Sequence, residues 1–149
     1  MLRFALALGG LVFLLGCALG SSRVRVAFEE NAGVEKSLIS SIRDYWEDRV
    51  KSGGKRFAEK AWRLEAPYIR ELVSRRKYEF YLKKDRGLVR VDIRKFLGCE
   101  REFYCCFDLK KYFKTSGEKR ITYAKDCWIK VKNNWYHVIN NPLIFPELG

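Results

Sequence analysis

Four cysteines in the second half of the chain are the residues whose type and spacing most directly predict chemistry. They are Cys99, Cys105, Cys106 and Cys127. Four cysteines allow three sets of two disulfides, and adjacent residues on a strand seldom bond to each other, which leaves two sets. Apolar alternation places Cys105 and Cys127 on core-facing positions of strands expected to pair. We therefore predict a Cys105–Cys127 bond and, as a weaker second, Cys99–Cys106, with reduced and packed thiols as the alternative.

The candidates for acid–base chemistry are few. They are Asp108, Tyr123, Asp126 and His137, the last being the single histidine of the chain. Alternation along its strand places Asp108 on the solvent side. His137 shares a strand face with Trp135 and Ile139, and one histidine in such a place is more often structural than catalytic. We therefore expect no catalytic residue.

Metal and cofactor chemistry lack the spacing that they require. The cysteines and His137 are of the right type to bind a metal, but the paired C-x-x-C spacing of zinc sites is absent. The sequence has neither a glycine-rich phosphate loop nor a serine-centred elbow. We therefore expect no metal and no cofactor.

The N-terminal residues have the pattern of an export signal. One arginine precedes an uncharged apolar run over residues 4–15, which is shorter than the roughly 20 residues needed to cross a bilayer. Leu14-Leu15-Gly16-Cys17 then resembles the lipobox of bacterial lipoproteins. The resemblance implies a signal peptide over 1–16, a lipidated Cys17 and a place in the cell envelope, facing the periplasm from an outer membrane if the organism has one. An ordinary secretory signal or an uncleaved anchor is the alternative.

Composition and charge describe a basic folded domain. The 149 residues suit one domain, and 48% hydrophobic with 15% aromatic residues exclude disorder for most of the length. The formal net charge is +12, and Arg23 and Arg25 follow the expected anchor, where anionic lipid would attract them. Because an export signal leads away from nucleic acid, we expect an envelope protein or small ligand as the partner.

We expect residues 17–33 to form the lipidated cysteine and a tether, and residues 34–149 to form the domain. The first half of this domain has helical periodicity. Apolar residues from Val34 to Val50 recur at helical spacing. Shorter helical patterns follow. The residues expected to start or stop the helices are Gly53-Gly54, Pro67, Ser74 and Gly87.

After Gly87 the apolar period changes to two, which predicts strands with one buried face. The expected core-facing residues are Val89, Val91, Ile93, Phe103, Cys105, Phe107, Leu109, Ile121, Tyr123, Cys127, Ile129 and Val131. Asn133-Asn134 predicts a tight hairpin turn before a last strand over 135–139. Helices followed by strands predict an α+β fold, with N-terminal helices packed on a curved antiparallel sheet of about four strands.

Local sequences within this layout resemble the nuclear transport factor two-like superfamily. They are Asp44-Tyr45-Trp46, the stretch from Ala61 to Tyr68, and the closing hairpin from Trp128 to Val138. The resemblance spans about residues 34–141 and implies a cone-shaped domain with a pocket. The possible pocket-lining residues are Trp46, Trp62, Tyr123, Trp128, Trp135 and His137. Packing in the core is the alternative for the tryptophans.

These observations predict a membrane-anchored, non-catalytic binding or docking module of the cell envelope with an unknown ligand. One alternative is a small-molecule isomerase or dehydratase that uses the cone-shaped pocket. Asp92 or Asp126 lining a deep cavity beside a tyrosine would favour that enzyme. The other alternative is a structural partner of another envelope protein, which would expose a large apolar patch.

Overall fold

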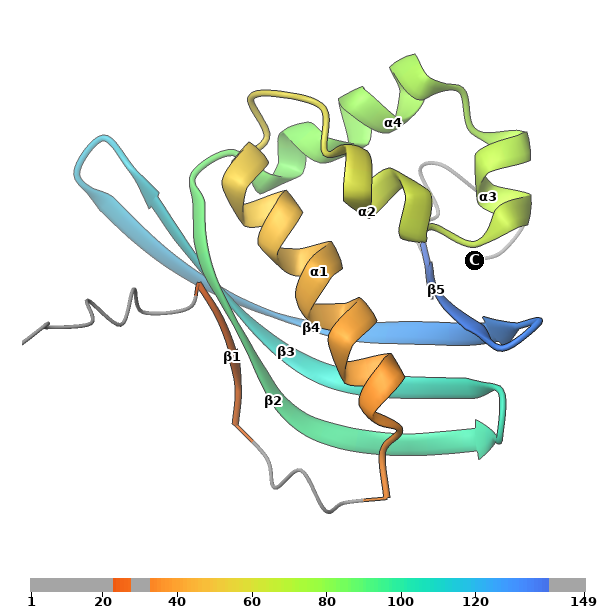
Figure 1. Cartoon of the computed structure of the whole chain (residues 1–149). Coiled ribbons are helices and arrows are strands. Elements are labelled where there is room, and N and C mark those ends of the chain that lie inside the picture. The colour runs from red at the N-terminus through yellow and green to blue at the C-terminus, as the bar shows by residue number, and fades with distance from the viewer. Residues whose placement is uncertain (1–22, 28–32, 140–149) are drawn as a thin grey trace, which may run out of the picture.

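The computed structural model describes residues 23–27 and 33–139, which form a layer of helices on one side of a curved sheet (Figure 1). In chain order the elements are β1 (Val24–Val26), α1 (Lys36–Ser52), α2 (Glu59–Leu64), α3 (Pro67–Leu72), α4 (Arg75–Leu82), the 3-10 helix η1 (Lys83–Asp85), β2 (Leu88–Arg101), β3 (Tyr104–Thr115), β4 (Glu118–Val131) and β5 (Asn134–Val138). The α+β class is therefore confirmed. The sheet is mixed and has five strands, in place of the predicted antiparallel sheet of about four.

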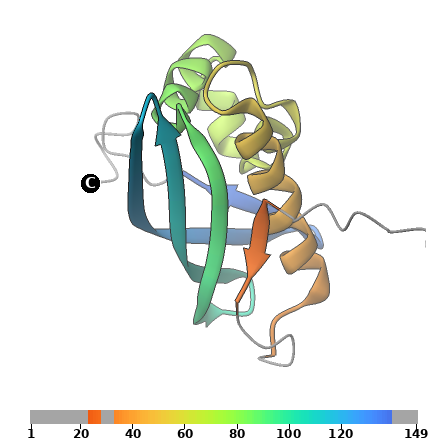
Figure 2. The same cartoon turned by 90° about the vertical axis from the view of Figure 1, so that its left-hand side faces the viewer.

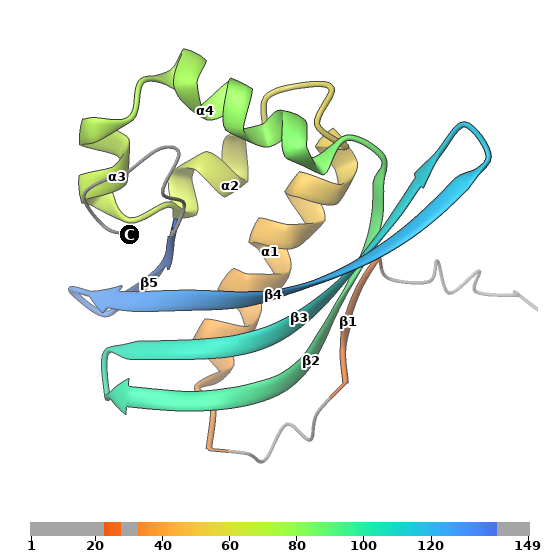
Figure 3. The ribbon, with the colours of Figure 1, turned by 180° about the vertical axis from the view of Figure 1, so that it is seen from behind.

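Helix α1 crosses the concave face of the sheet, as the views from both sides show (Figures 1 and 3). Its buried apolar residues are Leu38, Ile42, Tyr45, Trp46 and Val50, at the predicted helical spacing. The helix ends at Gly53, whose φ of 55° is left-handed and whose N–H donates to the Arg49 carbonyl. Glycine adopts this conformation without Cβ strain, so the predicted stop is confirmed.

Helices α2, α3 and α4 gather at one end of the sheet (Figure 1). Pro67 occupies the first turn of α3, where its missing N–H costs nothing. Ser74 caps α4, since its Oγ accepts a hydrogen bond from the Lys77 backbone N–H at 3.2 Å. Gly87 ends the helical half with a φ of 81°, and a Cβ there would lie 2.8 Å from the Lys114 carbonyl oxygen. These predicted boundary residues are confirmed.

The strands follow one another across the sheet in the order β1-β2-β3-β4-β5, and β2 to β5 form an antiparallel meander. The pairing of β2 with β3 is interrupted by register shifts, which bend a strand and increase its twist. Figure 2 shows the resulting curvature, with the described helices confined to the concave side. This concave side holds the core and the candidate site.

Strand β1 lies within the range predicted to be a tether, and for these residues that prediction is wrong. Val24 pairs in parallel with Val91, and the Val91 N–H donates to the Arg23 carbonyl at 3.0 Å. The Val24 side chain belongs to the buried core. A strand of three residues is too short for alternation to identify, and its partner strand comes much later in the chain. Arg23 and Arg25 are exposed on either side of Val24.

The buried face of β4 is the opposite of the one predicted. Asp126 and Trp128 face the core and are 2% and 0% exposed, whereas Ile121 and Tyr123 are 49% and 61% exposed. The prediction followed apolar alternation and placed Cys127, Ile129 and Val131 toward the core, on the face opposite to Asp126 and Trp128. It failed because Asp126 finds enough buried hydrogen-bond donors to occupy a core position.

Three smaller strand predictions are also wrong. A register shift beside Val89 leaves it exposed, and Leu88 is buried instead. Phe103 lies in the turn between β2 and β3 and is exposed. The closing hairpin turns one residue earlier than expected, because Lys132 and Asn133 have the positive φ values, 48° and 66°.

Candidate functional site

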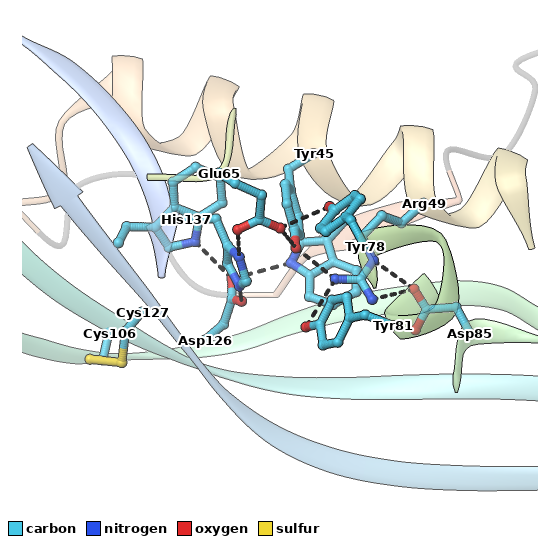
Figure 4. Close-up of polar contacts among 12 residues, drawn as sticks. Tyr45, Arg49, Glu65, Tyr78, Tyr81, Asp85, Cys106, Asp126, Cys127 and His137 are labelled. Atoms are coloured by element: carbon cyan, nitrogen blue, oxygen red, sulfur yellow. Dashed lines mark hydrogen bonds and ion pairs between the residues drawn. A yellow bond between two sulfur atoms is a disulfide. The ribbon is translucent and has the colours of Figure 1, made fainter. Parts of the chain in front are cut away.

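A network of buried polar side chains lies between the helical layer and the concave face of the sheet (Figure 4). We call this set the buried network: Tyr45, Arg49, Glu65, Tyr78, Asp85, Asp126 and His137. Its members come from both helices and strands. Because buried ionised groups are stable only when they are paired and hydrogen-bonded, the contacts decide which chemistry the network can perform.

His137 is held between two carboxylates. Its Nδ1 lies 2.8 Å from Oε2 of Glu65, and its Nε2 lies 3.0 Å from Oδ1 of Asp126. Ionised carboxylates only accept hydrogen bonds, so both ring nitrogens donate and the ring is an imidazolium. Burial alone would lower the pKa of His137, but the charges of Glu65 and Asp126 outweigh burial and raise it. Neither nitrogen keeps a lone pair with which to accept a substrate proton.

Asp126 is engaged on both carboxylate oxygens. The indole nitrogens of Trp46 and Trp128 donate to Oδ2 at 3.2 and 2.8 Å, while Oδ1 faces His137. Burial raises the pKa of Asp126, but the His137 charge and these hydrogen bonds outweigh burial and lower it. The carboxylate therefore stays ionised at neutral pH, whereas an efficient general base titrates near that pH.

Glu65 connects the helical layer to the sheet. Its Oε1 accepts hydrogen bonds from the hydroxyls of Tyr45 at 2.7 Å and Tyr78 at 2.8 Å. The backbone reinforces this connection, since the N–H of Ala66 donates to the His137 carbonyl at 2.9 Å. Burial, followed by the charge of Glu65, raises the pKa of Tyr78, so that phenol stays a neutral donor.

Arg49 extends the network to the far end of α1. Its Nε donates to Oδ2 of Asp85 at 2.6 Å, and its Nη1 donates to the Tyr45 hydroxyl at 2.6 Å. The guanidinium carbon lies 4.9 Å from the Trp46 ring centroid and 5.0 Å from that of Tyr81, which is cation–π geometry. Burial opposes the charged form, but the Asp85 charge and the surrounding tyrosine hydroxyls together outweigh burial and raise the pKa of Arg49.

A cavity of about 190 Å³ borders the network, and we call it the basic cavity. The lining residues that matter below are Trp46, Tyr81, Lys84, Lys111, Asp126 and His137. Nζ of Lys84 lies 3.5 Å from the Tyr81 ring centroid, and Nζ of Lys111 lies 4.5 Å from that of Trp46. Loss of hydration, followed by repulsion from Arg49, lowers the pKa of the half-buried Lys111. The same two causes lower the pKa of Lys84 to about 6, although part of its side chain is exposed at the mouth of the cavity.

A larger groove of about 670 Å³ lies near the start of α1, and we call it the end groove. Trp135 Nε1 donates to Oε2 of Glu35 at 2.7 Å, and Lys130 Nζ pairs with Oε1 of the same residue at 2.7 Å. Phe103 and Leu38 add apolar walls. These contacts tie the residue before α1 to the β4–β5 hairpin and leave a concave, mixed surface beside it.

Two disulfides join β2, β3 and β4: Cys99–Cys105 and Cys106–Cys127. The predicted pairs, Cys105–Cys127 and Cys99–Cys106, are therefore wrong, although the expectation of two bridges holds. Cys105 lies opposite Cys99 and Cys106 lies opposite Cys127 in the strand register. The error follows from the wrong face of β4, because the prediction had placed Cys127 on the core side.

The six residues predicted to line a pocket fall in different places. Three border a hollow: Trp46 and His137 the basic cavity, and Trp135 the end groove. Trp62 packs against Tyr78 with ring centroids 4.7 Å apart, and Trp128 is fully buried as a donor to Asp126. Tyr123 is exposed on the outer face of the sheet. The core alternative therefore describes Trp62 and Trp128.

The remaining candidates for chemistry are also placed. Asp108 lies on the solvent side and pairs with Arg94 at 3.5 Å. The four cysteines are bonded to one another, and within residues 23–27 and 33–139 no group of acidic, cysteine and histidine side chains is arranged to hold a metal.

Sequence reasoning missed Arg49, Glu65 and Lys111. Arg49 carried a usable signal: it follows the buried Tyr45 by four positions and so lies on the same helix face. A charged residue on the apolar stripe of a helix indicates a buried ion pair. Lys111 also carried a signal, because it continues the alternation of Cys105, Phe107 and Leu109 on the buried face of β3. Glu65 carried no comparable signal, because it lies on no periodic stripe that predicts its burial.

Comparison with protein-family models and with curated proteins finds no match for this chain. Among solved structures it is similar to a SEC-C motif containing protein from Psychrobacter arcticus, with a TM-score of 0.57 and 15% identity over 74% of this chain. A SEC-C motif containing protein from Rhodopseudomonas palustris aligns with a TM-score of 0.47 and 12% identity, over 65% of this chain and 74% of that protein. The chain spans 64% of the Psychrobacter protein, less than two thirds of its length. At this identity the likeness shows the fold alone.

The predicted resemblance to the nuclear transport factor two-like superfamily is wrong, because the structural neighbour that shares this fold with a TM-score of 0.57 is a SEC-C motif containing protein. The tryptophans that suggested it have a local explanation: Trp46 and Trp128 are the indole donors that a buried Asp126 requires. The lipobox-like sequence and Cys17 lie outside the described residues. Within the part of the chain that the structure describes, no helix is both long and apolar enough to cross a bilayer.

Proposed function

We propose that the protein is an exported, lipid-anchored and non-catalytic binding module of the cell envelope. The observation that carries the proposal is the pair of disulfides, Cys99–Cys105 and Cys106–Cys127. Disulfides persist in oxidising compartments outside the cytoplasm and are rare in cytosolic proteins. The signal-like residues 1–16 and the lipobox-like sequence ending at Cys17 would deliver the chain to such a compartment and hold it there.

The position of β1 supports a domain held close to the membrane surface. The few residues between Cys17 and Val24 span at most about 25 Å when fully extended. β1 is an edge strand, and Arg23 and Arg25 are exposed there. Each basic residue near an anionic surface adds about 1 kcal/mol of attraction, which would strengthen a lipid anchor.

The saturation of the ionisable groups supports binding over catalysis. His137 donates from both nitrogens, and Asp126 accepts on both oxygens. Acid–base catalysis needs a group that is free to exchange a proton with the substrate. The end groove and the basic cavity instead provide concave surfaces with fixed polar groups, as binding sites do.

Intact-mass measurement of the membrane fraction tests the envelope proposal. We expect a mature chain that begins at Cys17 and carries acyl chains, and a Cys17→Ser variant that carries none. Ser22→Ala, which changes a neighbouring residue, is the matched control and should be acylated like the wild type. An unmodified Cys17 in the wild-type membrane fraction would contradict the proposal.

Thiol labelling tests the oxidising compartment separately. Alkylation of the unfolded, unreduced protein should label none of the four remaining cysteines, and labelling after reduction should reach all four. Four reactive thiols in freshly isolated protein would remove the observation on which the export proposal rests.

An isomerase or dehydratase is the second candidate, because Asp126 and Tyr81 border one cavity. Such an enzyme would need Asp126 to take up a proton near neutral pH, whereas its contacts lower its pKa. Carbon-detected NMR titration of the Asp126 carboxyl group separates the candidates. We expect no titration between pH 5 and 8, and a midpoint in that range would favour the enzyme.

A further inference from the structure

Two ammonium groups meet at the basic cavity without an acidic partner. Lys84 comes from η1 and Lys111 from the concave face of β3, and both border the same hollow. The ammonium group of Lys84 lies over the Tyr81 ring and that of Lys111 lies over the Trp46 ring. Among the described residues, no carboxylate forms an ion pair with either lysine.

The carboxylates in this region are already engaged. Asp126 is bound by His137 and two indoles. Asp85 is bound by Arg49 through Oδ2, while its buried Oδ1 has no hydrogen-bond partner among the described residues. Glu65 accepts from two tyrosines and His137. None of these carboxylates lies within ion-pair distance of Lys84 or Lys111. The positive charge that Lys84 and Lys111 bring to the cavity is therefore left for a group from outside.

We propose that the basic cavity binds a compact oxyanion, a phosphate or phosphate ester group, through the ammonium groups of Lys84 and Lys111. The proposal rests on the binding function proposed above and names its ligand class. Two lysines suit a group that carries up to two negative charges, and charge-assisted hydrogen bonds to it are among the stronger polar contacts. The rings of Trp46 and Tyr81 leave apolar walls for a small substituent on that group.

The cavity predicts an unusual pH dependence for this binding. The groups that surround the Lys111 ammonium are Lys84, Arg49, Asp85, Asp126 and His137, together with the rings of Trp46 and Tyr81. Desolvation and the neighbouring cations lower the pKa of Lys111 below that of an ordinary lysine and lower that of Lys84 to about 6. Binding requires the charged ammonium groups, so affinity for phosphate should fall as pH rises through these lowered values, first through that of Lys84. A bound anion should in turn raise the pKa of Lys111.

Isothermal titration of the purified full chain in uncharged detergent and chloride buffer tests the site. We expect inorganic phosphate to bind in a 1:1 ratio. Lys111→Met and Lys84→Met should each weaken binding by about tenfold or more, the effect of one charge-assisted hydrogen bond. Lys111→Arg should restore most of it. Lys60→Met, an exposed position on α2, removes the same charge outside the cavity and should change nothing.

Thermal unfolding separates a binding role from a structural one. Because Lys111 is partly desolvated without an anionic partner, Lys111→Met should leave the unfolding temperature of the phosphate-free protein unchanged or raised. Phosphate should stabilise the wild type and Lys60→Met, but not Lys111→Met. No stabilisation of the wild type by millimolar phosphate, or equal losses in Lys60→Met and Lys111→Met, would overturn the proposal.

Vesicles distinguish the source of the phosphate. Preference for phosphatidylglycerol over phosphatidylcholine vesicles, abolished by Lys111→Met and competed by inorganic phosphate, would support a lipid head group. Phosphate binding that vesicles do not alter would support a soluble ligand. The acylation of Cys17 is measured by mass on the same samples, so a failed titration is distinguishable from a failed envelope proposal.

Discussion

Replacing His137 by phenylalanine should destabilise the domain by removing the cation between two buried carboxylates. Phenylalanine preserves a ring that can stack on Tyr45, where the centroids are now 4.3 Å apart, so the change is mainly electrostatic. Removing one partner of a buried ion pair typically costs about 3–5 kcal/mol. Two carboxylates lose their partner here, so we expect a loss in the upper part of this range. That is a large share of the roughly 5–15 kcal/mol by which small domains are stable.

The pH dependence of stability distinguishes the loss of these ion pairs from a simple loss of packing, because packing does not depend on protonation. The pKa of His137 is raised in the folded protein, so its stabilisation is complete below its unfolded value of about 6.5 and declines as pH rises through the folded value. The pKa of Asp126 is lowered, so its contribution is present above the unfolded value and is lost as pH falls through the folded one. In His137→Phe the buried carboxylates of Glu65 and Asp126 no longer face a cation, so they should take up protons more readily. The variant should therefore gain stability on acidification from neutral pH.

Urea unfolding at several pH values measures this difference. Adding Glu65→Gln and Asp126→Asn to His137→Phe should recover part of the loss at neutral pH, because the two buried charges are then absent. Tyr136→Phe alters the neighbouring β5 position and should change stability by less than about 0.5 kcal/mol. A loss below about 1 kcal/mol for His137→Phe, with a pH profile parallel to that of the wild type, would refute the assignment of His137 as a paired imidazolium.

Three further predictions concern elements that hold the domain together. Changing Cys106 and Cys127 to serine should cost about 3 kcal/mol in urea unfolding, because the bond closes a loop with a sequence separation of 21, and reductant should reduce this difference. Deleting residues 1–27 should lower the unfolding temperature, because burial of an apolar side chain such as that of Val24 contributes about 1.5–3 kcal/mol. An unchanged unfolding temperature would restore the interpretation of these residues as a tether. Ser74→Ala should lower stability by about 1 kcal/mol in thermal circular dichroism, because α4 loses its N-terminal cap. Ser40→Ala, at an exposed position of α1, is its control.

The helical half was predictable because its signals are local. A helix start or stop depends on a few neighbouring residues, so Gly53, Pro67, Ser74 and Gly87 could be identified without knowing the rest of the fold. The sheet depends on distant partners. β1 has only three residues, and its burial follows from pairing with Val91, which no local pattern reports.

The inverted face of β4 shows why the candidate site was only partly predicted. Apolar alternation assigns a charged residue to solvent, and Asp126 is buried because hydrogen-bond donors around it offset its desolvation. These donors are His137 from β5, Trp46 from α1 and Trp128 two positions along β4 itself. Once that face was misassigned, Cys127 was placed on the wrong side and the disulfide pairing failed with it. A single error about one buried charge therefore altered two further predictions.

The buried network also determines how the helical layer docks on the sheet. Apolar packing alone tolerates small shifts between layers, whereas hydrogen bonds require particular distances and directions. Glu65 contacts α1 through Tyr45, α4 through Tyr78 and β5 through His137, so one carboxylate fixes three elements at once. An apolar replacement of the whole network could preserve stability and still lose this unique arrangement. The basic cavity would lose its shape in such a variant, because its walls come from the same elements.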